Sequence, residues 1–75
     1  MIKFKERLVE LKLEKKLSSK EIAEIIGVSK RAVNEYLKGD INPSIQNLIK
    51  LADLFNCSLD YLVGRDFKQK EKTKD

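Results

Sequence analysis

Two short helical patterns that stand almost directly next to each other constrain the fold of this chain more than any other feature. The first begins at Ser18, whose hydroxyl can accept from the Glu21 amide while the Glu21 side chain reaches back; this capping box is a strong helix start. It should end at Gly27, because glycine adopts a left-handed conformation most easily. Ser29 can cap the next helix, which should end at Gly39. Two helices joined so closely must cross at roughly 90 to 120°.

Apolar residues at spacings of three and four predict three more helices. The first covers about residues 2–16, the fourth begins at Ser44 after Pro43, and the fifth begins at Ser58 and ends near Gly64. With 41% hydrophobic residues, three glycines and one proline, the composition suits a small all-α domain better than a disordered chain or a β-sandwich. We expect one domain over residues 1–67 and a polar, basic, disordered tail over residues 68–75.

The predicted core is formed by the apolar residues that repeat along one side of each helix. In the first helix, Phe4, Leu8 and Leu11 make the inward stripe, whereas Val9 and Leu13 make a second and more exposed one. The inward residues of the later helices should be Ile22, Ala23, Ile25 and Ile26; Val33, Tyr36 and Leu37; Ile45, Leu48, Ile49, Ala52 and Phe55, with Leu51 and Leu54 widening that face; and Leu59, Leu62 and Val63.

Charge and residue usage exclude several classes of function. The net charge of +4 is only a weak indication of a nucleic-acid partner, because the residues from Arg65 onward contribute +2 of it. The chain has no histidine and one cysteine, Cys57, so it lacks the usual zinc spacings and cannot form an internal disulfide. Charges interrupt the N-terminal stretch too often for a signal peptide or a membrane span. We therefore expect a cytoplasmic protein without catalytic residues, metal, cofactor, membrane contact or small-molecule ligand.

The helix that follows Ser29 carries the residues that point to a function. Because Val33, Tyr36 and Leu37 face inward, its remaining long polar side chains must project outward. An α-helix fits the major groove of B-DNA, and such side chains can reach base edges or phosphates. The outward residues are Lys30, Arg31, Asn34, Glu35 and Lys38.

The run from Glu6 to Gly64 resembles the Cro/cI-type (XRE-type) helix-turn-helix family, which includes phage repressors and small bacterial regulators. The pieces that carry the resemblance are LS-x-x-E-I-A, G-V-S, the helix end from Tyr36 to Gly39, NPS at 42–44 and the closing S-L-D-x-L-V-G. The resemblance implies a compact five-helix, lambda-repressor-like domain. It also implies a transcriptional regulator, by default a repressor, that binds an inverted-repeat operator in double-stranded DNA as a homodimer.

The resemblance also implies roles for individual residues. Base reading falls to Lys30, Arg31 and Glu35, with Ser29 and Asn34 beside them. Arg31 would favour guanine and Asn34 adenine, while Glu35 either accepts from cytosine or pairs with Arg31 at i, i+4. The residues expected to contact DNA phosphates are Ser19, Lys20, Lys38, Asn42 and Ser44.

Three departures from the family pattern affect these expectations. Many members have glutamine where this chain has Ser19, which is too short both to buttress the recognition helix and to touch a phosphate, so anchoring shifts towards Lys20. Lys12 and Leu37 stand where some members have an ion pair, and we expect Leu37 to replace it by apolar packing. Asp40 occupies a loop position that is often basic, so the loop should hold phosphate less well.

A protein-interaction module on the same fold, such as an antitoxin or an anti-repressor, is the alternative function. Exposed apolar surface would favour it, because such surface marks contact sites for other proteins. The same residues can instead form the seam of a homodimer, which is the interpretation we prefer. The candidates for that seam are Val9, Leu13, Leu51, Leu54 and Phe67.

Overall fold

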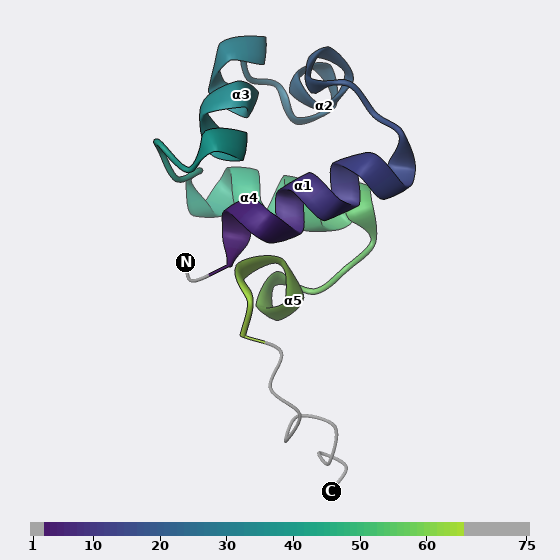
Figure 1. Ribbon diagram of the computed structural model, residues 1–75, viewed down its shortest axis with the longest axis vertical. Coiled ribbons are helices and arrows are strands. Elements are labelled where there is room, and N and C mark those ends of the chain that lie inside the picture. The colour runs from purple at the N-terminus through teal and green to yellow at the C-terminus, as the bar shows by residue number, and fades with distance from the viewer. Residues whose placement is uncertain (1–2, 66–75) are drawn as a thin grey trace, which may run out of the picture.

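The computed structural model describes residues 3–65, which form five α-helices (Figure 1). These are α1 (Phe4–Lys15), α2 (Ser19–Ile26), α3 (Lys30–Lys38), α4 (Ile45–Phe55) and α5 (Leu59–Val63). Residues 3–65 contain no strand, so the predicted all-α class is confirmed. The expected domain boundary after residue 67, the expected disordered tail and the seam candidate Phe67 lie outside the described residues.

Serine caps set where four of the helices begin. The capping box of α2 is present, with the Glu21 amide donating to Ser18 Oγ at 3.0 Å and the Ser18 amide donating to Glu21 Oε1 at 2.7 Å. Ser29, Ser44 and Ser58 each accept from the amide three residues later, at 3.0 to 3.1 Å. Each such cap stabilises its helix by about 1 kcal/mol. All five helices end at a residue with left-handed backbone geometry.

The core is built from the inward stripes of all five helices. Its largest fully buried side chains are Leu8, Ile22, Ile26, Val33, Leu51 and Leu62. Leu37, Leu54 and Val63 are half-buried against this cluster. The packing of Leu37 confirms the expected apolar replacement of the family's ion pair.

Four residues predicted to face inward are exposed instead. Ile25, Ile45, Ile49 and Leu59 expose 56%, 67%, 44% and 39% of their surface. Each lies beside a buried apolar residue on its helix, and helical spacing alone does not decide which neighbour at the edge of a wide apolar face meets the core.

Leu51, in contrast, is more buried than predicted. It was expected at the edge of the apolar face of α4 and in the dimer seam, but it is fully buried. The reason is that α2 and α5 both pack against α4, so a wider part of that helix is covered than its spacing suggests. Leu51 therefore cannot take part in a dimer seam in this fold.

Side chains also join the helices across the domain. Arg7 of α1 donates from Nη1 to the Tyr61 carbonyl of α5 at 3.0 Å, and its guanidinium lies 4.1 Å from the centre of the Tyr61 ring. Lys50 of α4 donates from Nζ to the Ile26 carbonyl at the end of α2, at 3.4 Å. The Lys50 contact places a positive charge at the negative end of the α2 dipole.

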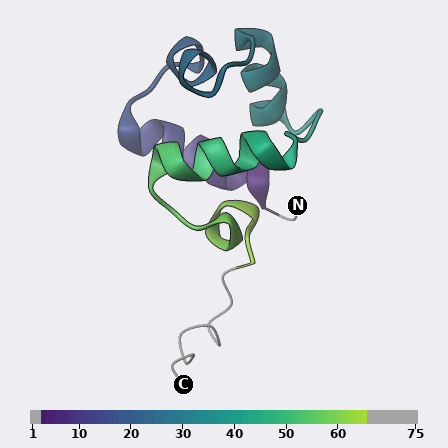
Figure 2. The ribbon, with the colours of Figure 1, turned by 180° about the vertical axis from the view of Figure 1, so that it is seen from behind.

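The arrangement places α2 and α3 together at one end of the domain and α5 at the other. α1 crosses the front of the domain in Figure 1, and α4 crosses the front in the reverse view of Figure 2. One side of α3 packs towards α1 and α2, which leaves its other side facing outward. None of the helices within residues 3–65 is both long and apolar enough to cross a membrane.

Candidate nucleic-acid interface

The inward side of α3 fixes how this helix is turned. Val33 is fully buried and Tyr36 exposes 4% of its surface. The Tyr36 ring meets the Phe4 ring of α1 edge-on, with 6.2 Å between the ring centroids and an interplanar angle of 71°. Such aromatic pairs stabilise a fold beyond the area they bury. The opposite side of α3 is therefore held towards solvent.

The predicted base-reading residues all lie on or beside this outward side. Ser29, Lys30 and Arg31 are exposed, whereas Asn34 and Glu35 are half-buried. Because they span only about two helical turns, from the cap to Glu35 of α3, the fold brings them together on a single short surface. The Ser29 hydroxyl oxygen also caps the helix by accepting from the Ala32 amide.

Arg31 and Glu35 form the i, i+4 pair that was one of the two alternatives for Glu35. Arg31 Nε lies 3.4 Å from Glu35 Oε2, and the two side chains expose 86% and 31% of their surface. An exposed pair of this kind contributes only about 0.3 to 0.5 kcal/mol. The contact orients the guanidinium at little cost, and Arg31 remains free to exchange it for another acceptor.

A second side-chain contact joins α2 to α3. The Ser19 hydroxyl donates to Asn34 Oδ1 at 2.8 Å, in a partly buried position. Ser19 was expected to be too short to serve both the recognition helix and a phosphate, and it serves the helix. Its one hydroxyl hydrogen is engaged there, so in this state it is not available to a phosphate.

Sequence reasoning missed this contact because the two residues are 15 positions apart. The available signal was the position of Ser19, where many members of the family that the sequence resembles have a glutamine that buttresses the recognition helix; it does not identify Asn34 as the partner. That signal is weak without the crossing geometry.

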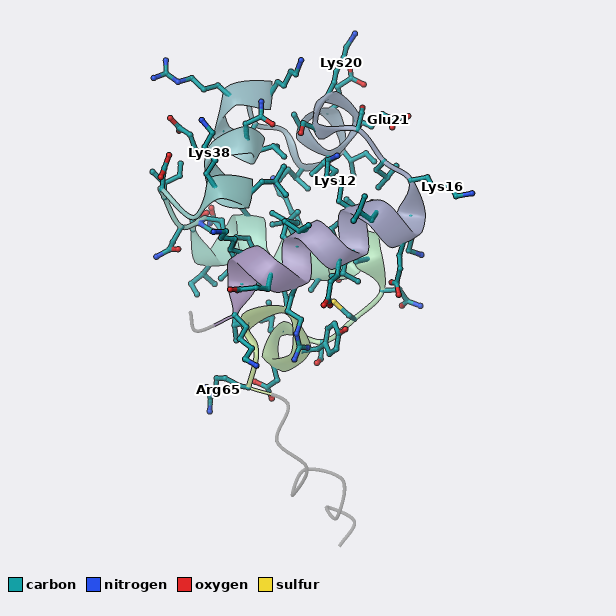
Figure 3. All side chains as sticks on the ribbon, viewed as in Figure 1. Lys12, Lys16, Lys20, Glu21, Lys38 and Arg65 are labelled. Carbon is teal, nitrogen blue, oxygen red and sulfur yellow. The ribbon has the colours of Figure 1, made fainter. Side chains whose placement is uncertain are left out.

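The other predicted phosphate ligands are exposed. Lys20 projects from the start of α2 at the end of the molecule opposite Arg65, and Lys38 projects from α3 (Figure 3). Asn42 and Ser44 are exposed around the start of α4, where the Ser44 oxygen caps the Asn47 amide. The free amides at the start of α2 carry a partial positive charge that favours phosphate beside Lys20. Asp40 is exposed in the loop after α3.

Comparison with known proteins shows which proteins this chain resembles. A helix-turn-helix family model matches residues 8–62. The HTH-type transcriptional regulator AnsR of Bacillus subtilis is 39% identical over 66 residues, which make up 88% of this chain and 56% of AnsR. The chain thus spans little more than half the length of this curated relative.

Two solved structures share the fold. A transcriptional regulator from Listeria innocua has a TM-score of 0.79 and 44% identity, over 81% of this chain and 57% of the other. The P22 c2 repressor, in complex with a synthetic operator, has a TM-score of 0.79 and 26% identity, over 88% of this chain and 98% of the repressor. The proteins to which this chain is similar are named as transcriptional regulators or repressors, and one of them was solved in complex with an operator. With its capped α2–turn–α3 unit and a family match over residues 8–62, the chain belongs to the Cro/cI-type (XRE-type) helix-turn-helix family.

Proposed function

We propose that this chain is a sequence-specific, double-stranded DNA-binding transcriptional regulator that acts as a repressor. A homodimer binds an inverted-repeat operator and places one α3 helix in the major groove of each half-site. The observation that carries the proposal is the two-sided character of α3. Lys30 and Arg31 are exposed on one side, while Val33 and Tyr36 lock the other side into the core. The similarity to the operator-bound P22 c2 repressor supports this proposal.

The exposed basic residues at the start of α3 are the proposed base readers. The planar guanidinium of Arg31 donates to O6 and N7 of guanine as a bidentate pair, and Lys30 donates to the same kinds of atom as a point charge. Glu35 holds Arg31 before DNA arrives, through the contact at 3.4 Å. The phosphate contacts are assigned to Lys20, Lys38, Asn42 and Ser44, all of which are exposed.

The proposed dimer seam differs from the one expected from the sequence. Ile41 in the loop after α3, and Ile45 and Ile49 four residues apart on α4, expose 42%, 67% and 44% of their surface. Ile41 lies three residues after the end of α3, and Ile45 and Ile49 lie on α4, the next helix of the chain. A two-fold contact here would place the two α3 helices on the same face of the dimer, as two half-sites roughly 34 Å apart require. Ile45→Lys should therefore shift sedimentation from dimer to monomer.

The matched control for the seam lies on α1. Leu13, from the seam expected on the sequence, exposes 69% of its surface, so Leu13→Lys introduces the same charge at a similarly exposed apolar site. It should leave sedimentation unchanged. Dissociation by Leu13→Lys alone would move the seam to α1, and a wild-type protein that sediments as a monomer even on DNA would refute the dimer.

The experiment that tests the function is a selection from random duplex DNA, followed by titration of the enriched and scrambled sequences. We expect an enriched inverted repeat with half-site centres one helical turn apart. Arg31→Ala should cost about 1 to 3 kcal/mol on the enriched site and much less on scrambled DNA. Arg65→Ala removes the same charge at the opposite end of the domain (Figure 3) and should change neither affinity substantially.

Two outcomes would contradict the proposal in different ways. Equal losses on both DNAs would make Arg31 a phosphate contact rather than a base reader. No enriched sequence at all would overturn operator reading and favour the protein-interaction module, such as an antitoxin, on the same fold.

A further inference from the structure

The contact between Ser19 and Asn34 changes what Asn34 can offer to DNA. The Ser19 hydroxyl donates to Asn34 Oδ1 at 2.8 Å, so the carbonyl end of the amide is turned towards α2. The two ends of a planar amide point in different directions. With Oδ1 directed at α2, the Nδ2 amino group is the end left to meet a ligand, and it is purely a donor.

Adenine recognition by asparagine needs both ends of the amide at once. Oδ1 must accept from adenine N6 while Nδ2 donates to N7. In the observed state the Ser19 hydroxyl occupies one of the two lone pairs of Oδ1 and draws this oxygen towards α2. Asn34 also sits deeper than Lys30 and Arg31, because it is half-buried, as Glu35 is, while Lys30 and Arg31 are exposed. Both observations separate Asn34 from the exposed side chains at the start of the helix.

We propose that Asn34 is a positioning residue, which Ser19 holds in place, and that it does not read adenine. The inference rests on the proposed DNA-binding function. The pair fixes α3 against the start of α2, where Lys20 and the free amides meet phosphate, and so sets the depth at which Lys30 and Arg31 enter the groove. Asn34 then meets DNA chiefly through its N–H donors, which suit a phosphate oxygen. Sequence preference therefore comes from Lys30 and Arg31, and Asn34 imposes no preference for adenine at any position of the half-site.

The first test needs no DNA. Urea unfolding of the wild type, Ser19→Ala, Asn34→Ala and the double variant forms a double-mutant cycle. One partly buried hydrogen bond joins the two side chains, so each single variant already removes it. The factor by which the double variant raises the unfolding constant should therefore be clearly smaller than the product of the factors for the two single variants. Additive losses would overturn the pair, whatever the protein binds.

The second test measures DNA recognition at single base pairs. Ser19→Ala and Asn34→Ala should each weaken binding to the enriched operator about three- to tenfold, the range of one net hydrogen bond. The double variant should lose no more than either single one. The preferred base at each operator position should stay as in the wild type for Asn34→Ala. Loss of an adenine preference at one position would overturn the proposal and return Asn34 to base reading.

A conservative variant separates the hydroxyl from simple packing. Ser19→Thr keeps the hydroxyl, whereas Ser19→Val has nearly the same shape without it. Ser19→Thr should retain the operator affinity of the wild type, whereas Ser19→Val should weaken it about three- to tenfold. Equal affinities for the two variants would show that the hydroxyl does not act in recognition. A wild type that enriches no sequence would refute operator reading and the recognition role of the pair together, while the unfolding cycle would still report on the contact itself.

Discussion

Replacing Gly64 by alanine should destabilise the domain more than replacing Gly27 by alanine, although both residues end a helix in the same conformation. Their φ angles are +83° and +79°. An L-residue in this left-handed region costs roughly 1 to 2 kcal/mol. The stiffer unfolded chain of an alanine variant offsets about 0.4 to 1 kcal/mol of this. The net strain should therefore be about 1 kcal/mol at either position.

The space around the two glycines is what differs. A Cβ at Gly27 meets nothing within 4 Å, whereas a Cβ at Gly64 lies 2.6 Å from Lys3 Cβ and 3.2 Å from the Lys3 backbone nitrogen. That backbone cannot move without loss of the bond from the Lys3 amide to the Val63 carbonyl, at 3.2 Å. Crowding of this kind costs about 1 to 3 kcal/mol. We expect a total of about 1 kcal/mol for Gly27→Ala and about 2 to 4 kcal/mol for Gly64→Ala.

Urea denaturation followed by circular dichroism measures both free energies. In a thermal scan each 1 kcal/mol corresponds to about 4 to 8 °C in Tm for a domain of this size. Gly39→Ala is the matched control and should resemble Gly27→Ala, because its Cβ meets only the flexible Lys5 side chain, with Cδ nearest at 3.1 Å. Equal losses at Gly27 and Gly64 would refute the steric reasoning.

Two further predictions concern charge and protonation. Lys50→Met removes the contact with the Ile26 carbonyl and should lower the free energy of unfolding by about 0.3 to 1 kcal/mol at low salt, and by less in 1 M NaCl. A loss that is independent of salt would assign the effect to packing. Burial raises the pKa of the Cys57 thiol, although the charge of Arg7 opposes this. Since the thiolate is the reactive form, iodoacetamide labelling of folded protein should rise at higher pH than labelling in urea, and coincident profiles would contradict this.

The helix boundaries were predictable because they depend on neighbouring residues in the chain. Ser18 and Ser29 cap as expected, since a cap is a contact over three residues. The exposed face of α4 was not predictable in the same way. Whether Ile45 or Leu51 enters the core depends on where α2 and α5 cross that helix, which spacing within one helix does not encode.

The same distinction between contacts within one helix and contacts between helices applies to the candidate interface. The outward position of Lys30 and Arg31 followed from the inward position of Val33 and Tyr36 on the same helix, and the structure places them so. The engagement of Asn34 with Ser19 depends on two helices meeting, so it required the three-dimensional arrangement.

The way α3 is held has a consequence for how this domain can diverge. Its cap at Ser29, its end at Gly39 and its buried Val33 and Tyr36 fix the rotational phase of the helix, and a shift of one residue would turn every side chain by about 100°. Exposed residues such as Lys30 and Arg31 contribute nothing to that phase. Substitutions at such sites are usually within about 0.5 kcal/mol of neutral. The exposed residues of α3 can therefore change during evolution while the orientation of the helix stays the same, so new binding partners can arise without a new fold.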